Sequence, residues 1–281
     1  MKYTTLIDTR TLAANLDRSD WVIVDCRFKL ADTGWGEAQY QAGHIPGAVY
    51  AHLDRDLSGH KTGRNGRHPL PEMDALQERF GRWGIGAGTQ VVAYDQDTGM
   101  EASRLWWLLR YLGHTAVAVL DGGLARWTAE GRPLRGGAER PTPATFIGQP
   151  QAEMLAEAGD IEQLRQDPSA RVIDARAPER FRGDTEPLDP VAGHIPGAVN
   201  HPYLSNLQAD GTFRMPADLR QHLAAALGGV PAAQTAVYCG SGVSACHNLL
   251  ALEHAGLTGA KLYAGSWSEW CAEEERPVAK A

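Results

Sequence analysis

The strongest constraint on this 281-residue chain is that it repeats itself. The heptapeptide Gly-His-Ile-Pro-Gly-Ala-Val occurs at residues 43–49 and again, 150 positions later, at residues 193–199. Other segment pairs recur in the same order: VIVDCR ending at Arg27 with RVIDAR ending at Arg176, VVAYD ending at Asp95 with TAVYC ending at Cys239, and DGGLARW ending at Trp127 with AGSWSEW ending at Trp270. Ordered matches with slowly drifting spacing predict a duplicated domain, and the length suits two domains of ordinary size.

The two copies are separated by residues 132–151, which are rich in proline and glycine and have the composition of a linker. We place the boundary near residue 145. This gives a first domain over residues 1–145 and a second over residues 146–281.

Each copy alternates short apolar, β-branched runs with helical stretches. This alternation predicts α/β domains, each with a parallel sheet covered by helices on both faces. Strands are expected at 21–25, 90–94 and 116–120 in the first copy and at 171–174, 234–238 and 260–263 in the second; helices at 72–83 and 102–112, and at 218–227 and 244–255. The repeated heptapeptide suits a tight turn that leads into a strand, so we assign it to architecture rather than chemistry.

Charge and composition narrow the classes of partner. The formal net charge is −7 and no basic block is present, which disfavours nucleic-acid binding through phosphates. No signal peptide and no apolar run long enough to span a bilayer is evident. The four cysteines have neither metal-ligand nor disulfide-framework spacing. We therefore expect a cytoplasmic protein with reduced thiols and with no metal, cofactor, membrane or nucleic-acid partner.

The chemical signal is the segment that follows the apolar run ending at Tyr238. Cys239 is expected at the carboxyl edge of the sheet, where open α/β folds bind ligands. Gly240 and Gly242 allow backbone conformations that can turn successive N–H groups inward as an anion nest. A helix starting near Ser244 adds the positive end of its dipole. Such a setting can lower a cysteine pKa from about 8.5 to roughly 3.5–7.5.

An alternative is that Cys239 is a small buried apolar residue at a strand end. The repeat argues against this, because the matching residue of the first copy is Asp95. A purely structural position would more plausibly be apolar in both copies. The first copy therefore looks catalytically silent. Cys26 is more plausibly a core residue, since its counterpart is Ala175. Cys246 is expected to be structural, with the trapping of an oxidised Cys239 as the alternative.

Taken together, the doubled GHIPGAV, the strand–Cys-Gly-Ser-Gly-Val-Ser–helix segment and the late GSWSEW resemble the two-domain rhodanese family of sulfurtransferases. The resemblance covers essentially the whole chain. It implies that Cys239 cycles through a persulfide. In the thiosulfate branch of that family the two residues after the cysteine are typically basic, whereas the 3-mercaptopyruvate branch typically has C-G-S-G-V-T. The loop here is similar to the second branch, with Ser244 in place of threonine.

The same resemblance implies an Asp–His–Ser relay. Ser241 is the serine of the loop, His68 in HPLP is the histidine, and Asp54 in AHLD is the aspartate, with Asp56 as its substitute. Without the family, His68 would be interpreted as a surface-loop histidine.

The resemblance further implies arginines against a substrate carboxylate. Arg180 in ERFRG matches one of them, but the family's Glu-Pro-Arg triplet here ends in Leu188, so the second is missing. Arg182, or the basic loop residues Lys61, Arg64 and Arg67, are candidates to compensate; the alternative for that loop is a solvated surface.

The predicted reaction transfers a sulfane sulfur from a small anionic donor, with 3-mercaptopyruvate favoured, to a thiol, cyanide or a reduced dithiol protein. Gly240, Gly242, Val243 and Ser244 are expected to bind the donor. Transfer from thiosulfate is the alternative. A cysteine phosphatase is disfavoured because the position six residues after Cys239 is Ala245, not arginine. A non-catalytic module is the remaining alternative.

Overall fold

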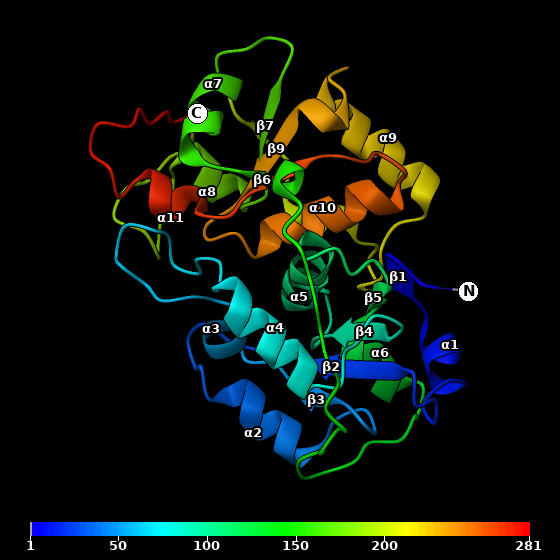
Figure 1. Ribbon diagram of the computed structural model, residues 1–281. Coiled ribbons are helices and arrows are strands. Elements are labelled where there is room, and N and C mark those ends of the chain that lie inside the picture. Colours follow the sequence, from blue (N-terminus) through cyan, green and yellow to red (C-terminus); the bar gives the residue numbers. More distant parts are fainter. Residues whose placement is uncertain (1) are drawn as a thin grey trace. The chain divides into compact units, whose positions relative to one another are not determined.

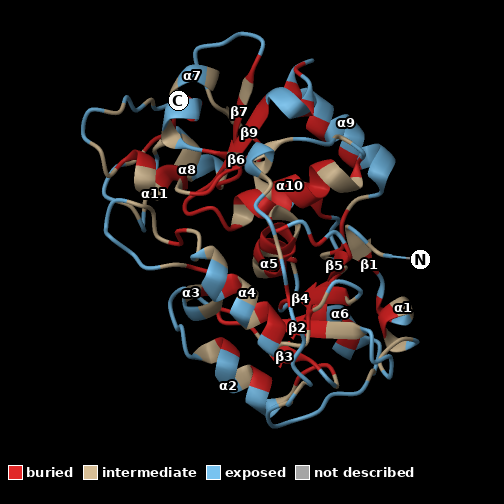
Figure 2. Cartoon of the chain, viewed as in Figure 1, coloured by how far each residue is buried: buried red, intermediate tan, exposed pale blue. Residues whose placement is uncertain are grey.

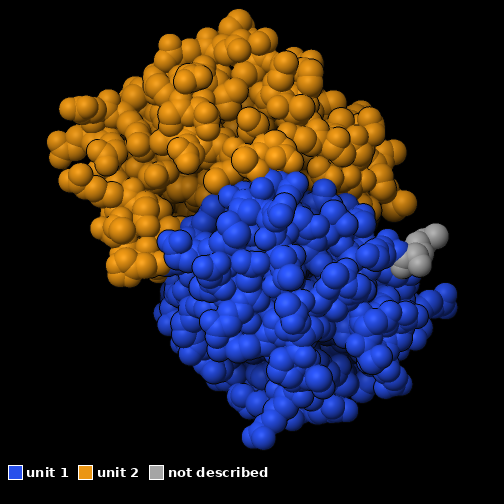
Figure 3. All heavy atoms as spheres, in the orientation of Figure 1, with its two compact units in different colours: residues 1–59, 70–151, 209–212 blue, residues 60–69, 152–208, 213–281 orange. Residues whose placement is uncertain are grey.

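The computed structural model describes residues 2–281 and divides them into two compact units (Figures 1 and 3). Among the described residues, the first unit comprises residues 2–59, 70–151 and 209–212, and the second comprises residues 60–69, 152–208 and 213–281. The predicted boundary near residue 145 stays a prediction. Residues 60–69 belong to the second unit although they lie within the first copy of the repeat.

The first unit is built on a parallel sheet of five strands in the order β1-β5-β4-β2-β3. Its strands are β1 (Leu6–Ile7), β2 (Trp21–Asp25), β3 (Val49–Tyr50), β4 (Gln90–Tyr94) and β5 (Val117–Leu120). Its helices are α1 (Thr9–Ala13), α2 (Trp35–Ala42), α3 (Leu53–Asp56), α4 (Met73–Arg82), α5 (Met100–Tyr111) and α6 (Gly123–Ala129). The central strand β4 is buried along its whole length, as a parallel strand covered by helices must be.

The second unit repeats this topology in the order β6-β10-β9-β7-β8. Its strands are β6 (Leu155–Ala156), β7 (Arg171–Asp174), β8 (Val199–Asn200), β9 (Thr235–Tyr238) and β10 (Lys261–Tyr263). Its helices are α7 (Ala158–Leu164), α8 (Pro178–Arg182), α9 (Pro216–Leu227), α10 (Ser244–His254) and α11 (Ser266–Trp270), with short 3-10 turns η1 (Ala152–Met154), η2 (Tyr203–Asn206) and η3 (Ala232–Gln234). The predicted α/β fold with two parallel sheets is confirmed.

In the second unit, the two elements on either side of the cysteine loop are buried. Strand β9 is entirely buried, and α10, which packs against it, buries eight of its residues, so both appear red in Figure 2. Helix α9 instead alternates a buried and an exposed face. The strand and the helix that flank the cysteine loop are thus fixed on a rigid core.

The repeated heptapeptide is architectural, as the sequence predicted. The backbone N–H of Ile45 donates to the Tyr94 hydroxyl, and that of Ile195 donates to the Tyr238 hydroxyl in the same way. The tyrosine is the last residue of the central strand in each unit. The heptapeptide therefore fastens a turn to the strand that carries the functional loop.

Residues 132–151, predicted as a linker, contact the first unit closely. Arg135 pairs with His44 through two backbone hydrogen bonds of 2.9 Å, and the Ala144 N–H donates to the Gly81 carbonyl. Phe146 is buried and packs edge-on against Phe80. The proline- and glycine-rich composition thus gives an extended strap rather than a loose connection.

Candidate active site

Cys239 directly follows strand β9 and precedes the loop that leads into α10. Only 2 % of the residue is exposed. Its Sγ accepts the backbone N–H of Gly242 at 3.1 Å and that of Ser241 at 3.5 Å. Two inward-pointing amides of this kind stabilise negative charge on sulfur. The nest that the sequence predicted is present around this atom.

The loop curves tightly because of Gly242, whose φ is +76°. A Cβ at this position would lie 2.4 Å from the Ala264 carbonyl oxygen, so no larger residue fits. Val243 and Ser244 then begin the helix. The four predicted donor-binding loop residues therefore lie between the end of β9 and the start of α10.

A second element holds the cysteine from the other side. The Cys239 N–H donates to the Ser266 hydroxyl at 3.1 Å, and that hydroxyl donates to the Tyr263 carbonyl. The Cys239 carbonyl accepts the Trp267 N–H at 3.0 Å. Ser266 has a φ of +55°, the one positive value at a non-glycine position within residues 2–281. A serine held there is strained, which is typical of functional sites.

The sequence prediction did not include Ser266. The repeat carried a signal, because GSWSEW aligns with DGGLARW and places Ser266 opposite Gly123. Gly123 has a φ of +57°, close to that of Ser266. A serine in a position where the other copy has glycine indicates a need for the hydroxyl.

The predicted pair His68 and Ser241 lies together within the second unit. The His68 Nδ1 and the Ser241 Oγ are 2.7 Å apart, and both side chains are buried. The segment 60–69 thus brings a histidine to the residue two positions after the cysteine. A hydrogen bond of this length allows proton transfer between the two groups.

Asp54, the third predicted member of the relay, lies on α3 in the first unit. The His52 ring caps this helix by accepting the N–H groups of Asp54 and Arg55. Asp56, the substitute, accepts the His52 N–H and forms an ion pair with Arg79 at 2.9 Å. The role of either aspartate in a relay stays a prediction.

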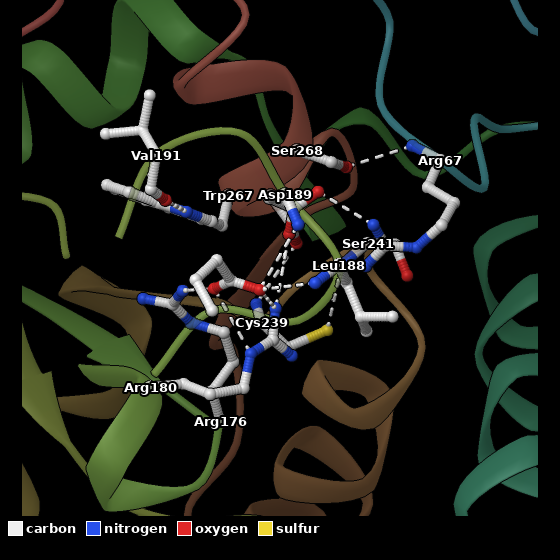
Figure 4. A network of polar contacts seen from close by, with 12 residues as sticks. Arg67, Arg176, Arg180, Leu188, Asp189, Val191, Cys239, Ser241, Trp267 and Ser268 are labelled. Atoms are coloured by element: carbon white, nitrogen blue, oxygen red, sulfur yellow. Dashed lines mark hydrogen bonds and ion pairs between the residues drawn. The ribbon is translucent and has the colours of Figure 1, made fainter. Parts of the chain in front are cut away.

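A chain of alternating charges surrounds the loop (Figure 4). Asp189 accepts from Arg67 at 2.7 Å through one oxygen and from Arg180 at 3.2 Å through the other. Glu186 pairs with Arg180 at 2.6 Å and with Arg176 at 3.3 Å. Because each guanidinium is matched by a carboxylate, the network orders Arg180 while keeping it beside the cysteine loop.

Arg176 anchors this network to the core. Its guanidinium donates to Asp174 and to the Gly193 carbonyl, and it stacks over the Trp267 ring at 4.8 Å. The Asp174 carboxylate raises the pKa of Arg176, although burial acts in the opposite direction. Arg67, Glu186 and Asp189 were not predicted as members of one network, since only the fold brings them together.

Position 188, where the resemblance implied a second arginine, carries a leucine that is 46 % exposed. Its backbone N–H donates to Glu186, as does that of Asp189. The turn around position 188 is therefore formed, but the leucine side chain carries no charge that could bind a carboxylate. Arg180 lies close to the loop, since a Cβ built on Gly240 would be 3.3 Å from its Nη1. Its role in donor binding stays a prediction.

The other thiols differ from Cys239. Cys246 is fully buried and donates to the Gly242 carbonyl at 3.3 Å. Burial raises the pKa of Cys271 to about 11 and that of Cys26 well above its usual value. None of the four cysteines, all within the described residues, forms a disulfide. Thiolate chemistry at neutral pH is therefore disfavoured at Cys26 and Cys271.

Within residues 2–281, no group of three or more histidine, cysteine or acidic side chains is arranged to hold a metal ion. The same residues include no helix with the length and hydropathy needed to cross a bilayer.

Comparison with known proteins adds independent evidence. The family model described as "Rhodanese-like domain" matches the chain twice, at residues 8–130 and 157–273. A probable 3-mercaptopyruvate sulfurtransferase of Pseudomonas aeruginosa is 48 % identical over 276 residues, which cover 98 % of this chain and 97 % of that protein. A thiosulfate sulfurtransferase of Rattus norvegicus is 32 % identical and covers 95 % of this chain and 92 % of its own length.

A solved structure also matches nearly the whole chain. The 3-mercaptopyruvate sulfurtransferase of Leishmania major superposes with a TM-score of 0.85 at 32 % identity, over 98 % of this chain and 75 % of that one. Both copies of the repeat therefore have the fold that the sequence resemblance implied.

Proposed function

Because the chain belongs to the rhodanese-like family and is a sulfurtransferase, we propose that it takes a sulfur atom from 3-mercaptopyruvate and carries it as a persulfide on Cys239. The observation that carries this proposal is the Cys239 Sγ, which accepts two loop N–H groups at the carboxyl end of β9. Similarity to the Pseudomonas and Leishmania proteins supports the choice of donor.

In the first half-reaction the Cys239 thiolate attacks the donor sulfur. An S–S bond forms, the donor's C–S bond breaks, and its electron pair leaves with carbon as the enolate of pyruvate. Each of the two sulfur atoms is formally oxidised by one electron and the donor carbon is reduced by two, so no external oxidant is needed. The Ser241 and Gly242 amides stabilise the anionic sulfur before and after transfer without reorganising.

The enolate must gain a proton to leave as pyruvate. The Ser241 hydroxyl belongs to the cysteine loop and is hydrogen-bonded to His68 at 2.7 Å, so this pair can deliver that proton. We propose Asp54 as the third member that orients His68. In the second half-reaction a thiol, cyanide or a reduced dithiol protein takes the outer sulfur and restores the thiolate.

The first unit is proposed to be catalytically silent, because Asp95 stands at the position of Cys239 and its carboxylate is not a sulfur nucleophile. Four cysteines that form no disulfide within the described residues support our expectation of a reducing compartment such as the cytoplasm.

Thiosulfate is the second candidate donor. A relative named as a thiosulfate sulfurtransferase matches nearly the whole chain. Arg67 and Arg180 lie next to Gly240 of the cysteine loop, where a dianion could bind. Sulfite leaves as a stable anion and needs no proton. The two donors therefore make different demands on Ser241.

Replacing Ser241 with alanine tests the proposal. We expect Ser241→Ala to lower kcat/KM for 3-mercaptopyruvate by about 10²-fold, within the usual range for acid–base groups, and to leave the value for thiosulfate nearly unchanged. Ser169→Ala, at an exposed position, is the control for loss of a hydroxyl. An unchanged ratio of the two kcat/KM values would remove the Ser241–His68 pair from the mechanism.

A further inference from the structure

Two guanidinium groups meet directly over Gly240, the residue that follows Cys239. A Cβ built on Gly240 would lie 3.0 Å from the Arg67 Nη2, 3.3 Å from the Arg180 Nη1 and 3.5 Å from its Nη2. Both side chains are therefore within van der Waals contact of the loop that holds the reacting sulfur. Any side chain larger than glycine at this position would press against them.

Asp189 shows what these two arginines can hold. Its carboxylate bridges them, with one oxygen accepting from Arg67 at 2.7 Å and the other from Arg180 at 3.2 Å. The Asp189 side chain is 4 % exposed, whereas the side chains of Arg67 and Arg180 are 19 % and 16 % exposed. The arginines thus keep an edge that solvent and a small anion can reach.

Contacts of Arg67 and of the residues on either side of it fix its backbone beside the cysteine loop. Its backbone N–H donates to the Ser268 hydroxyl at 2.9 Å. The preceding Gly66 lies so close to Gly265 that a Cβ would be 2.7 Å from the Gly265 oxygen. The following residue, His68, is bonded to Ser241. One short segment therefore places a cation and the histidine of the pair at the same loop.

The other candidate cations lack this placement. Lys61 and Arg64 lie on an exposed part of the same loop, and Arg182 is exposed and paired with Asp184. Leu188 has no charge to offer. Among the basic residues considered as replacements, the contact with Gly240 singles out Arg67.

We propose that Arg67 is the second carboxylate-binding residue of this enzyme and, with Arg180, selects donors that carry a carboxylate. The inference rests on the proposed function. Asp189 bonds to the Arg67 Nη1 and the Arg180 Nη2, whereas the Arg67 Nη2 and the Arg180 Nη1 are the nitrogens nearest to Gly240. A donor carboxylate over Gly240 would accept charge-assisted hydrogen bonds from these two nitrogens, so the cation missing at position 188 is supplied from residue 67.

The test compares 3-mercaptopyruvate with its methyl ester, which has the same reacting sulfur and leaving enolate but no carboxylate. We expect Arg67→Met, which keeps an apolar stem, to lower kcat/KM for the acid by about 10–100-fold and to change that for the ester by less than about 3-fold. Arg67→Lys should fall between wild type and Arg67→Met for the acid. Arg64→Met, an exposed residue of the same loop, is the matched control and should leave both values unchanged.

Three results would overturn the inference: equal losses for acid and ester, no loss for either, or an equal effect of Arg64→Met. Equal losses would mean that Arg67 acts through the position of His68 rather than on the carboxylate. Failure of the proposed function is a different result, because wild-type protein treated with 3-mercaptopyruvate would then show no added sulfur on Cys239.

Discussion

The loop after β4 and the loop after β9 start from the same architecture and hold different groups. Each loop follows a buried tyrosine, Tyr94 or Tyr238, that ends a central strand. In each loop the helix begins five residues after the first loop residue, which is Asp95 or Cys239. In the first loop the Asp95 carboxylate accepts four backbone N–H groups, from residues 97, 99, 101 and 102. In the second loop the Cys239 sulfur accepts two.

The difference shows that the anion-binding geometry belongs to the fold and the chemistry belongs to one residue. The carboxylate of Asp95 fills its own nest, so this loop is stabilised from within. Burial raises the pKa of Asp95, and burial together with the Asp95 charge raises that of Glu101 well above its usual range. The second loop has a sulfur in that place, beside arginines instead of a second buried acid.

The segment that contacts each loop from behind also differs between the two copies, and again only the second copy has the polar group. The Gly123 counterpart of Ser266 has almost the same backbone conformation without a side chain. Carbonyl groups of both loops accept equivalent N–H donors, Leu124 to Asp95 and Trp267 to Cys239. Only the second copy adds a hydroxyl that receives the N–H of the functional residue.

The largest expected effect comes from moving the nucleophile between the loops. In an Asp95→Cys, Cys239→Ser double variant we expect sulfur transfer from both donors to fall by at least about 10³-fold, because the negative charge of nearby Asp97 disfavours a thiolate at position 95, whereas the two arginines lie beside the other loop. Steady-state rates measure this. Asp95→Cys alone is the control and should keep near wild-type rates; rates of the double variant above those of Cys239→Ser would contradict the comparison.

Exchanging Ser266 for its counterpart should have a smaller effect. Ser266→Gly relieves a strained φ, which stabilises the folded state by about 1 kcal/mol. It also removes a buried hydrogen bond, which destabilises the folded state by about the same amount. We expect thermal stability to change little while kcat/KM falls about 10-fold, since an N–H beside the nucleophile loses its acceptor. Ser266→Ala keeps the strain and loses the bond, so it should lose both activity and stability. Full activity in Ser266→Gly would show that the hydroxyl is dispensable.

The smallest effect concerns the buried acid of the first loop. The raised pKa of Glu101 means that the folded state binds this proton more tightly than the unfolded state, so the stability it contributes is full at acid pH and is lost as pH rises. Glu101→Gln removes this titration. We expect its Tm to exceed that of wild type at pH 8 by about 2–4 °C, with the gap closing toward pH 4. Exposed Glu153→Gln is the control; a gap that is independent of pH would contradict a raised pKa.

The sequence was sufficient for much of the fold. The apolar runs at 21–25, 90–94 and 171–174 are strands with these bounds, because central parallel strands are continuous β-branched segments. The two-residue edge strand Leu6–Ile7 was not predicted, since it is too short to show a period. The strand Val49–Tyr50 was expected only as the continuation of the heptapeptide turn, without bounds.

The site was predictable where chemistry is local in sequence. Cys239 and its glycines could be interpreted from one segment and its counterpart. The contact of His68 with Ser241 spans 173 positions and was expected only from the family resemblance. The charge network of Arg67, Asp189 and Arg180 depends on side-chain packing from three segments, for which the sequence has no periodic signal.

The central claim is that Cys239 alone carries the transferred sulfur. The most direct measurement is peptide mass spectrometry of protein treated with 3-mercaptopyruvate, with fragment spectra that separate Cys239 from Cys246 and a parallel Cys246→Ser sample. We predict one added sulfur atom on Cys239, lost again after addition of a thiol or cyanide, and none on Cys271, whose pKa of about 11 leaves little thiolate at neutral pH. Added sulfur on another cysteine, or on none, would contradict the account.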